Sequence, residues 1–163
     1  PDPFLVGEAC PASYADPAAG IDYPGTYNLT ATARRVQDVL TALAAAKSLS
    51  NGGDVALVGT GEAGLWCLLA RSQDPGGRTA LDMRQFRLTD EEFLARCPIP
   101  LVREAGDLRT AVALIAPHPL FLENPGELAF WAQRAYRGAG AATALVIEPG
   151  GRSPSELVAW LVG

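Results

Sequence analysis

The stretch DVALVGTGEAGLWCLLA, residues 54–70, is the feature that most constrains how this chain can fold. Its pattern predicts an apolar strand, a sharp glycine turn and then a helix. The run from Val55 to Val58 has no polar face, so we expect a strand that is buried on both sides, as in a parallel sheet. Known proteins use such a turn in two ways: a serine nucleophile stands on it, or its glycines admit a dinucleotide phosphate. The centre of this turn is Gly61, which offers no hydroxyl for attack.

The chain of 163 residues divides into two segments. Residues 1–27 are rich in proline and glycine, which predicts an irregular N-terminal segment with a short strand at 4–6. Residues 28–163 have the pattern of one folded domain. Predicted strands cover 55–58, 79–81, 120–122 and 144–147. The helices between and around them begin near Asn28 or Thr30, Glu62, Thr89, Asp107, Gly126 and Ser153, and Asp107 is expected to be the cap of its helix.

Strands that alternate with helices predict an α/β fold, with a mostly parallel sheet and helices on both faces. The clearest helix signal lies near the C-terminus, where Ser153 precedes Pro154 and Glu156 follows three residues later. Ligands of such sheets bind beyond the carboxyl ends of the strands. Candidate site residues are therefore expected within 59–64, 82–87, 123–127 and 148–153.

Composition excludes several classes of function. Apolar residues make up 48% of the chain and charged residues 19%, which is typical of a soluble globular protein. The apolar runs are about as long as strands and are broken by charges, so no membrane span is expected. The net charge is −5, whereas a nucleic-acid-binding surface needs clustered positive charge.

Metal sites and cofactors are not expected either. The cysteines are Cys10, Cys67 and Cys97, and their spacing matches no zinc pattern. The only histidine, His118, lies between two prolines at the entrance of a predicted strand. A strand of about five residues spans roughly 17 Å, so His118 is expected at the end of the sheet opposite the candidate site.

The glycine turn agrees in spacing with a dinucleotide-binding fingerprint. Gly59, Gly61 and Gly64 form the pattern G-x-G-x-x-G between a strand and a helix. Asp82 ends the next predicted strand, where an acid that binds ribose would lie. The turn follows more than fifty residues and a long helix, however, rather than opening the domain. The alternative is that these glycines only allow a tight crossing from strand to helix.

Five segments occur in an order that suggests another interpretation. They are YNLTATARRVQDVLTAL, VALVGTGEAG, ALIAPHPLFLEN, ELAFWAQRAYRGAGA and IEPGGRSPSELVAWL. In this order they resemble the C-terminal half of bacterial α/β-hydrolases of the acetyl xylan esterase and dienelactone hydrolase type. The resemblance covers residues 28–163 and implies an α/β-hydrolase-like fold, of which this chain supplies the C-terminal portion.

The resemblance also implies where a catalytic triad would lie. The nucleophilic serine belongs at Gly61, the acid at Glu127 or, as a second choice, Glu123, and the histidine near Arg152. Arginine stays protonated and cannot act as a general base. The resemblance therefore implies a degenerate triad, with neither a nucleophile nor a base. We expect that replacing Gly61 by serine alone would not create activity.

A part of the hydrolase site can persist without the nucleophile. Gly61, Glu62 and Ala63 lie at the start of a predicted helix, where the helix dipole and backbone N–H groups favour negative charge. In a hydrolase, the N–H that follows the nucleophile helps to form the oxyanion hole. These three residues are thus a candidate anion-binding pocket, although Glu62 at this position can equally serve only to stabilise the helix end.

The α/β-hydrolase sheet has about eight strands, and this chain supplies four clear ones. Half a sheet leaves an apolar edge open, and open edges pair with other strands. We expect a protein partner or an upstream domain to cover that edge; the alternative is a complete small α/β domain. The expected function is that of a non-catalytic structural or interaction module, or of a non-catalytic companion to an esterase domain. The alternatives are a part of an active esterase whose nucleophile lies elsewhere, and a small dinucleotide-binding domain.

Overall fold

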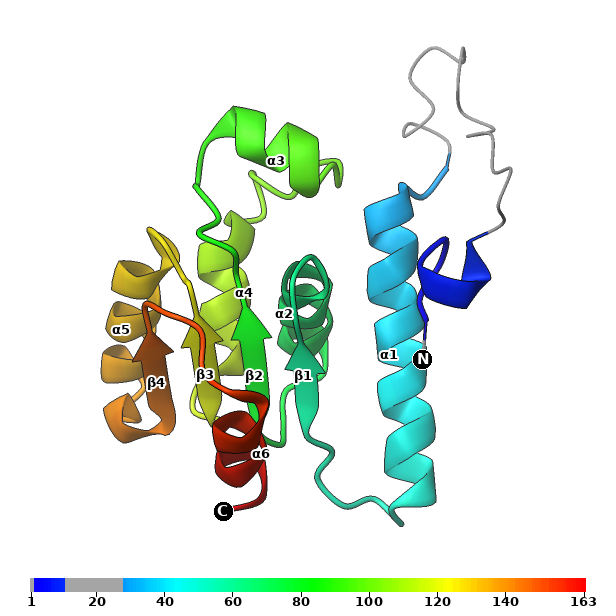
Figure 1. Ribbon diagram of the computed structural model, residues 1–163. Helices are drawn as coiled ribbons and strands as arrows, with labels where there is room; N and C mark the ends of the chain where they lie inside the picture. Colours follow the sequence, from blue (N-terminus) through cyan, green and yellow to red (C-terminus); the bar gives the residue numbers. More distant parts are fainter. Residues whose placement is uncertain (1, 11–27) are drawn as a thin grey trace.

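A computed structural model describes residues 2–10 and 28–163. Four strands form one all-parallel sheet in the order β1-β2-β3-β4, so strands that follow each other in the chain are also neighbours in space (Figure 1). The predicted α/β class is confirmed. The strands are β1 (Leu57–Gly59), β2 (Thr79–Asp82), β3 (Leu120–Glu123) and β4 (Leu145–Glu148).

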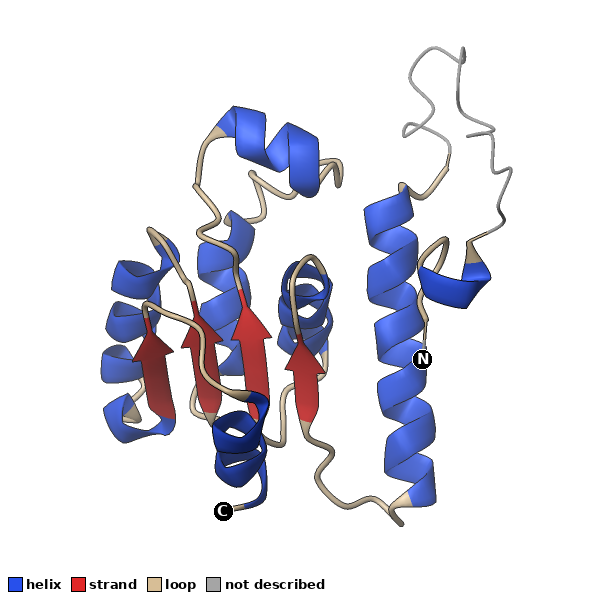
Figure 2. Cartoon of the chain, in the orientation of Figure 1, coloured by secondary structure: helices blue, strands red, loops and turns tan. Residues whose placement is uncertain are grey.

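Helices flank the sheet on both faces, as the sequence predicts (Figure 2). Right-handed crossovers between consecutive parallel strands place their connecting helices on one face, and α2, α4 and α5 lie there. Helix α6 crosses the opposite face, and α1 packs beside α2, beyond the β1 edge. The helices are α1 (Ala31–Leu49), α2 (Ala63–Gln73), α3 (Asp90–Arg96), α4 (Asp107–Ile115), α5 (Leu128–Gly138) and α6 (Pro154–Val162), with short 3-10 helices at Gly7–Ala9 and Ala142–Ala144.

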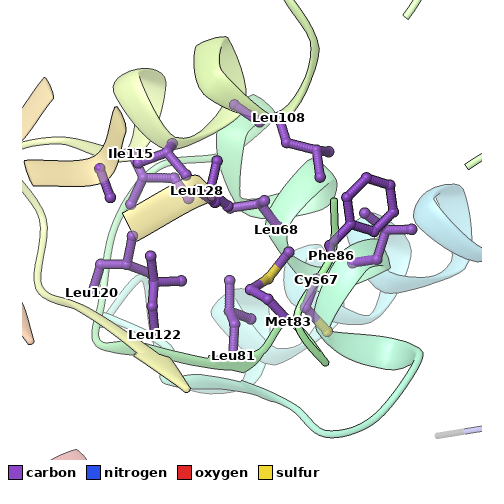
Figure 3. Close-up of a cluster of buried hydrophobic side chains, with 14 of the residues drawn as sticks. Cys67, Leu68, Leu81, Met83, Phe86, Leu108, Ile115, Leu120, Leu122 and Leu128 are labelled. Carbon is purple, nitrogen blue, oxygen red and sulfur yellow. The ribbon is translucent and has the colours of Figure 1, made fainter. Parts of the chain in front are cut away.

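Side chains of the strands alternate between two unequal layers. Leu81 and Leu122 are in register, are fully buried and join the main core beneath α2, α4 and α5 (Figure 3). Phe121 points to the other face, where its ring centroid lies 5.4 Å from that of Trp160 in α6. The core also contains Leu65, Leu68, Met83, Phe86, Leu108, Val112, Ile115, Leu128 and Tyr136.

Local signals in the sequence correctly placed the ends of several helices. The Thr30 hydroxyl accepts a hydrogen bond from the Ala33 N–H and caps α1. At α6, Ser153 and Glu156 form a complete capping box, with Pro154 in the first turn. These caps satisfy backbone N–H groups that a helix cannot bond internally, which is why they can be predicted without knowledge of the fold.

Three predictions about local structure were wrong. Residues 4–6 form a turn rather than a strand. Asp107 does not precede α4 as its cap: Gly106, in a left-handed conformation, holds that place, and Asp107 is the first helical residue. The β1 strand is not buried on both sides, because Val58 is 41% exposed at the margin of the sheet. Of the predicted irregular segment, residues 11–27 lie outside the described residues.

Two strands have a free side among the described residues, because β1 pairs only with β2 and β4 only with β3. The Leu57 N–H donates to the Arg78 carbonyl, 2.9 Å away, so the N–H and C=O of Val58 point away from β2. Both edges of the sheet therefore present backbone groups without a strand partner. No helix in the described part of the chain is long and apolar enough to cross a membrane.

Candidate functional site

The carboxyl ends of the strands bring three acidic residues into one row. Asp82, Glu123 and Glu148 are the last residues of β2, β3 and β4, and they are in register across the sheet. The glycine turn follows the neighbouring strand, β1, at the same edge. Because ligands of parallel sheets bind at this edge, it is the place to look for a functional site.

The three glycines of the turn have different reasons to be glycine. A Cβ on Gly59 would lie 2.7 Å from the Ala63 carbonyl oxygen, and a Cβ on Gly64 would overlap the Asp82 carbonyl. These two glycines let α2 approach the strands closely. Gly61 has a φ of +58°, a backbone conformation that favours glycine, yet a Cβ there would meet nothing within 4 Å. Of the three glycines, Gly61 is thus the one from which a side chain would project into open space.

Glu62, next in the turn, is held by two arginines. Its carboxylate accepts hydrogen bonds from Arg84, at 2.8 Å, and from Arg96, at 3.2 Å. Arg96 also pairs with Glu92 at 2.7 Å and lies over the ring of Phe86. Burial lowers the pKa of Arg96, but its hydrogen bonds to Glu92 and Glu62 outweigh burial and raise the pKa above its ordinary value. An ordered ion network therefore occupies the entrance to α2.

The candidate anion pocket of Gly61, Glu62 and Ala63 is only partly available. The Ala63 N–H donates to the Thr60 carbonyl at 3.1 Å, whereas the Glu62 N–H makes no hydrogen bond within the described residues. One backbone donor of the three is thus committed to the turn, and the Glu62 carboxylate adds negative charge beside the helix start. That charge disfavours an anion, although Arg84 and Arg96 partly offset it.

The two candidate acids lie in different surroundings. The Glu127 carboxylate accepts a hydrogen bond from the Leu88 N–H at 3.3 Å. The Glu123 carboxylate accepts one from the backbone N–H of Arg152 at 3.0 Å. The structure therefore brings the second choice, Glu123, against residue 152, and places Glu127 against the loop after β2.

Arg152 is bound to the end of the sheet by its side chain as well. Its Nε and Nη2 atoms both lie 3.2 Å from one oxygen of Glu148, and its guanidinium lies 5.2 Å from the ring centroid of Phe121. A guanidinium has hydrogen-bond donors and no acceptor, so this side chain cannot take a proton from a nucleophile. Its contacts tie the loop before α6 to the sheet.

The residues of the dinucleotide hypothesis gain no support from the geometry. The Asp82 carboxylate already accepts hydrogen bonds from the Arg84 N–H, at 2.9 Å, and from the Asn124 side chain, at 3.0 Å. Gly59 and Gly64 are accounted for by the close packing of α2. The hypothesis for Gly59, Gly61, Gly64 and Asp82 stays a prediction.

His118 lies at the amino end of β3, two residues before Leu120. The glycine turn and the acidic row lie at the carboxyl end of the sheet. The His118 carbonyl accepts a hydrogen bond from the Tyr136 hydroxyl at 2.7 Å, which fixes the entrance of the strand. This location agrees with the expectation that His118 lies at the end of the sheet opposite the candidate site.

Little space exists at the candidate site in the part of the chain that the structure describes. A crevice between the ends of β1 and β2 and helix α6 reaches Thr60, Asp82, Glu123 and Leu157, but it is too narrow for a water molecule. Larger surface grooves, of about 370 Å³ and about 290 Å³, lie elsewhere. Among the described residues, no group of three histidine, cysteine or acidic side chains could hold a metal ion.

Sequence reasoning missed the arginines that surround the turn. Arg84 lies in the segment 82–87, which follows a strand and was singled out for its position, but the sequence carries no sign that Arg84 pairs with Glu62. Arg96 comes from α3, 34 residues beyond Glu62. Only the folded chain brings these residues together.

Comparisons with protein-family models, with curated proteins and with solved structures found no match to this chain. The four-stranded parallel α/β fold is thus established by the structure, whereas membership of the α/β-hydrolase superfamily remains an interpretation of the residues.

Proposed function

We propose that this chain is a non-catalytic α/β-hydrolase-like module with a structural or interaction role, a companion to an esterase domain. Three features support the proposal: the strand-turn-helix element around Gly61, the loop positions of the candidate acids, and the place of Arg152 after the last strand. Gly61, Glu123 and Arg152 follow the chain order nucleophile, acid, base that α/β-hydrolases use.

One observation carries the non-catalytic part of the proposal. The backbone at Gly61 presents no side chain, and at the base position the Arg152 guanidinium pairs with Glu148 while its backbone N–H donates to Glu123. Acyl transfer by a serine enzyme needs a nucleophile and a neighbouring base that takes its proton. Among the described residues neither group lies at the triad positions of this edge, and the crevice beside it offers no room for a substrate.

The interaction part of the proposal rests on the β1 edge. Val58 points its N–H and C=O away from β2, and the residue is 41% exposed. Helix α1 packs beside α2 and lies beyond β1 (Figure 1). A further strand added next to β1 would therefore lie next to α1. A strand from an upstream domain or a partner chain would bond to Val58 and lie beneath α1.

The proposal is tested by measuring aryl acetate hydrolysis by the native protein, the heat-unfolded protein and an Arg152→Ala variant. We expect the three rates to be equal within error, since any slow reaction would come from exposed side chains rather than from a site. A native rate well above the unfolded rate that falls on mutation of Arg152 would overturn the non-catalytic assignment.

A second function is favoured by the same open edge. In that alternative, the chain completes the sheet of an active esterase whose nucleophile lies in another segment or chain. Hydrolysis would then appear only when the companion segment is present. Val58→Pro distinguishes this case, because proline removes the N–H that faces the free edge and would abolish the assembled activity without breaking the pairing of β1 with β2.

A further inference from the structure

We propose that the opposite edge of the sheet, strand β4 with helix α5, is a docking groove for an extended, carboxylate-bearing peptide segment of a partner protein. The segment would add to β4 as a fifth strand. This surface is separate from the glycine turn and from the β1 edge, so the inference goes beyond the proposed function.

The backbone of β4 is arranged to accept such a strand. The Asn124 N–H donates to the Glu148 carbonyl at 2.9 Å, so the peptide groups of Glu148 face β3. In a parallel ladder the direction alternates along the strand, and the N–H and C=O groups of Leu145 and Ile147 therefore face away from β3. Main-chain groups at this spacing pair with an extended chain and not with a helix.

The same two residues form one wall of a groove. Leu145 and Ile147 are half-buried on the face that α5 covers, and the groove between them and α5 has a volume of about 290 Å³. Its remaining lining residues are Gln133, Tyr136, Arg137 and Ala142. Side chains on one face of an added strand would enter this groove at every second position.

The positive charge of Arg137 in the groove favours a peptide segment that carries a carboxylate. Arg137 lines it, is exposed, and makes no ion pair or side-chain hydrogen bond within the described residues. No carboxylate lines the groove, because the nearest strand acid, Glu148, points to the other face and pairs with Arg152. A carboxylate placed between two apolar side chains of the segment would therefore meet an uncompensated guanidinium.

Strand β4 also lacks the features that prevent an edge strand from pairing with another chain. Its sequence, Leu-Val-Ile-Glu, contains no proline, no lysine and no bulge, and its three apolar residues favour strand pairing. The charge of Glu148 is neutralised by Arg152 rather than facing an incoming strand. This edge is suited to strand addition.

The test uses a fluorescein-labelled peptide, Thr-Val-Thr-Glu-Thr-Val-Thr, with blocked ends, and measures its fluorescence anisotropy with the full chain. The valines and the glutamate lie on one face of the extended peptide, so they would enter the groove together. We expect saturable binding, and weaker binding by on the order of fivefold when the glutamate of the peptide is replaced by lysine.

Two protein variants locate the binding. Ile147→Pro removes an N–H that faces the free edge, and so it should keep the pairing with β3 but weaken binding by about tenfold or more. Arg137→Glu should weaken binding by on the order of fivefold, whereas Arg134→Glu, one turn earlier on α5 and outside the groove lining, should not. Circular dichroism and thermal unfolding confirm that each variant is folded.

Several results would overturn the proposal. They are absence of saturable binding, binding that a folded Ile147→Pro variant retains, and equal effects of Arg134→Glu and Arg137→Glu. Binding that is lost in Val58→Pro but kept in Ile147→Pro would place the peptide at β1 instead. Concentration-dependent dimerisation that Ile147→Pro abolishes, without peptide binding, would assign the edge to a second copy of the chain.

Discussion

The backbone N–H of Arg152 donates a hydrogen bond of 3.0 Å to the carboxylate of Glu123. Arg152 lies in the loop after β4, and Glu123 is the last residue of β3. In the hydrolase interpretation, Arg152 takes the position of the base and Glu123 that of the second-choice acid. The acid thus meets the backbone of residue 152, and the arginine side chain turns to Glu148. In a hydrolase, an acid at this place would orient the catalytic histidine. Here the contacts of Glu123 and Glu148 with Arg152 hold the loop before α6 against the end of the sheet.

We predict that Gly61→Ser remains inactive toward aryl acetates, because a serine without a base is not activated. The residue has a φ of +58°, so the variant should lose about 1 kcal/mol of stability through backbone strain. Its hydrolysis rate and thermal unfolding are compared with those of Thr60→Ser, which keeps a hydroxyl beside the turn and adds no such strain. A large gain in rate from Gly61→Ser alone would show that the base lies somewhere other than at Arg152.

Gly64→Ala should be severely destabilising, by about 3 kcal/mol, since the added Cβ overlaps the Asp82 carbonyl and would push α2 from the sheet. The control is Gly138→Ala at the end of α5, where a Cβ meets nothing within 4 Å, and which should leave stability unchanged or slightly raise it. Urea unfolding of the two variants measures the difference. Equal stability would mean that α2 does not approach β2 as closely as described.

Trp160→Ala should loosen α6 from the sheet. The Trp160 ring packs against Phe121, and Arg78 both lies over the ring and donates to the Trp160 carbonyl at 3.0 Å. Because the side chain is only half-buried, we expect a loss of about 2 kcal/mol and greater binding of a hydrophobic dye. Val162→Ala, at an 81% exposed position of the same helix, should have little effect.

Stability should fall between about pH 9 and pH 11. Burial raises the pKa of Cys67 to about 11, although Arg71 lowers it, and burial also raises the pKa of Cys97 to about 11, from an ordinary value of 9.0. The folded state therefore keeps these thiols protonated while the unfolded state loses their protons, so stability is fully present below pH 9. Each thiol can account for at most ~3 kcal/mol at high pH.

The measurement is urea unfolding at pH 8 and pH 11, for the native protein and for Cys67→Ala. The variant should lose somewhat less than half of the pH-dependent decrease, because Cys97 and the Tyr136 phenol, whose pKa burial also raises above its ordinary value, still contribute. A decrease of the same size in the variant would mean that other groups cause it.

The fold was predictable where the signal was local. Ser153, Pro154 and Glu156 specify the start of α6 within four residues, and Thr30 caps α1 in the same way. The alternation of strands and helices was sufficient for the α/β class, because a parallel strand requires a crossover.

Features that depend on distant pairing were not predictable. Val58 has the sequence context of a buried strand, but its exposure depends on which strand lies next to β1 in space. Likewise, Glu123 and Glu127 are only four residues apart in the sequence. Glu123, at the end of β3, accepts a hydrogen bond from Arg152, whereas Glu127, at the start of α5, accepts one from Leu88. The sequence pattern correctly predicted that the candidate residues lie at the carboxyl ends of the strands. It did not predict which residues form hydrogen bonds with each other there.

The central claim is that the turn at Gly61 carries no reactive serine system, and a fluorophosphonate probe with intact-mass spectrometry tests it most directly. The native chain should remain unmodified under conditions that fully label an active serine esterase. A single adduct on a serine within residues 28–163, formed by the folded protein but not by the unfolded protein, would contradict the account.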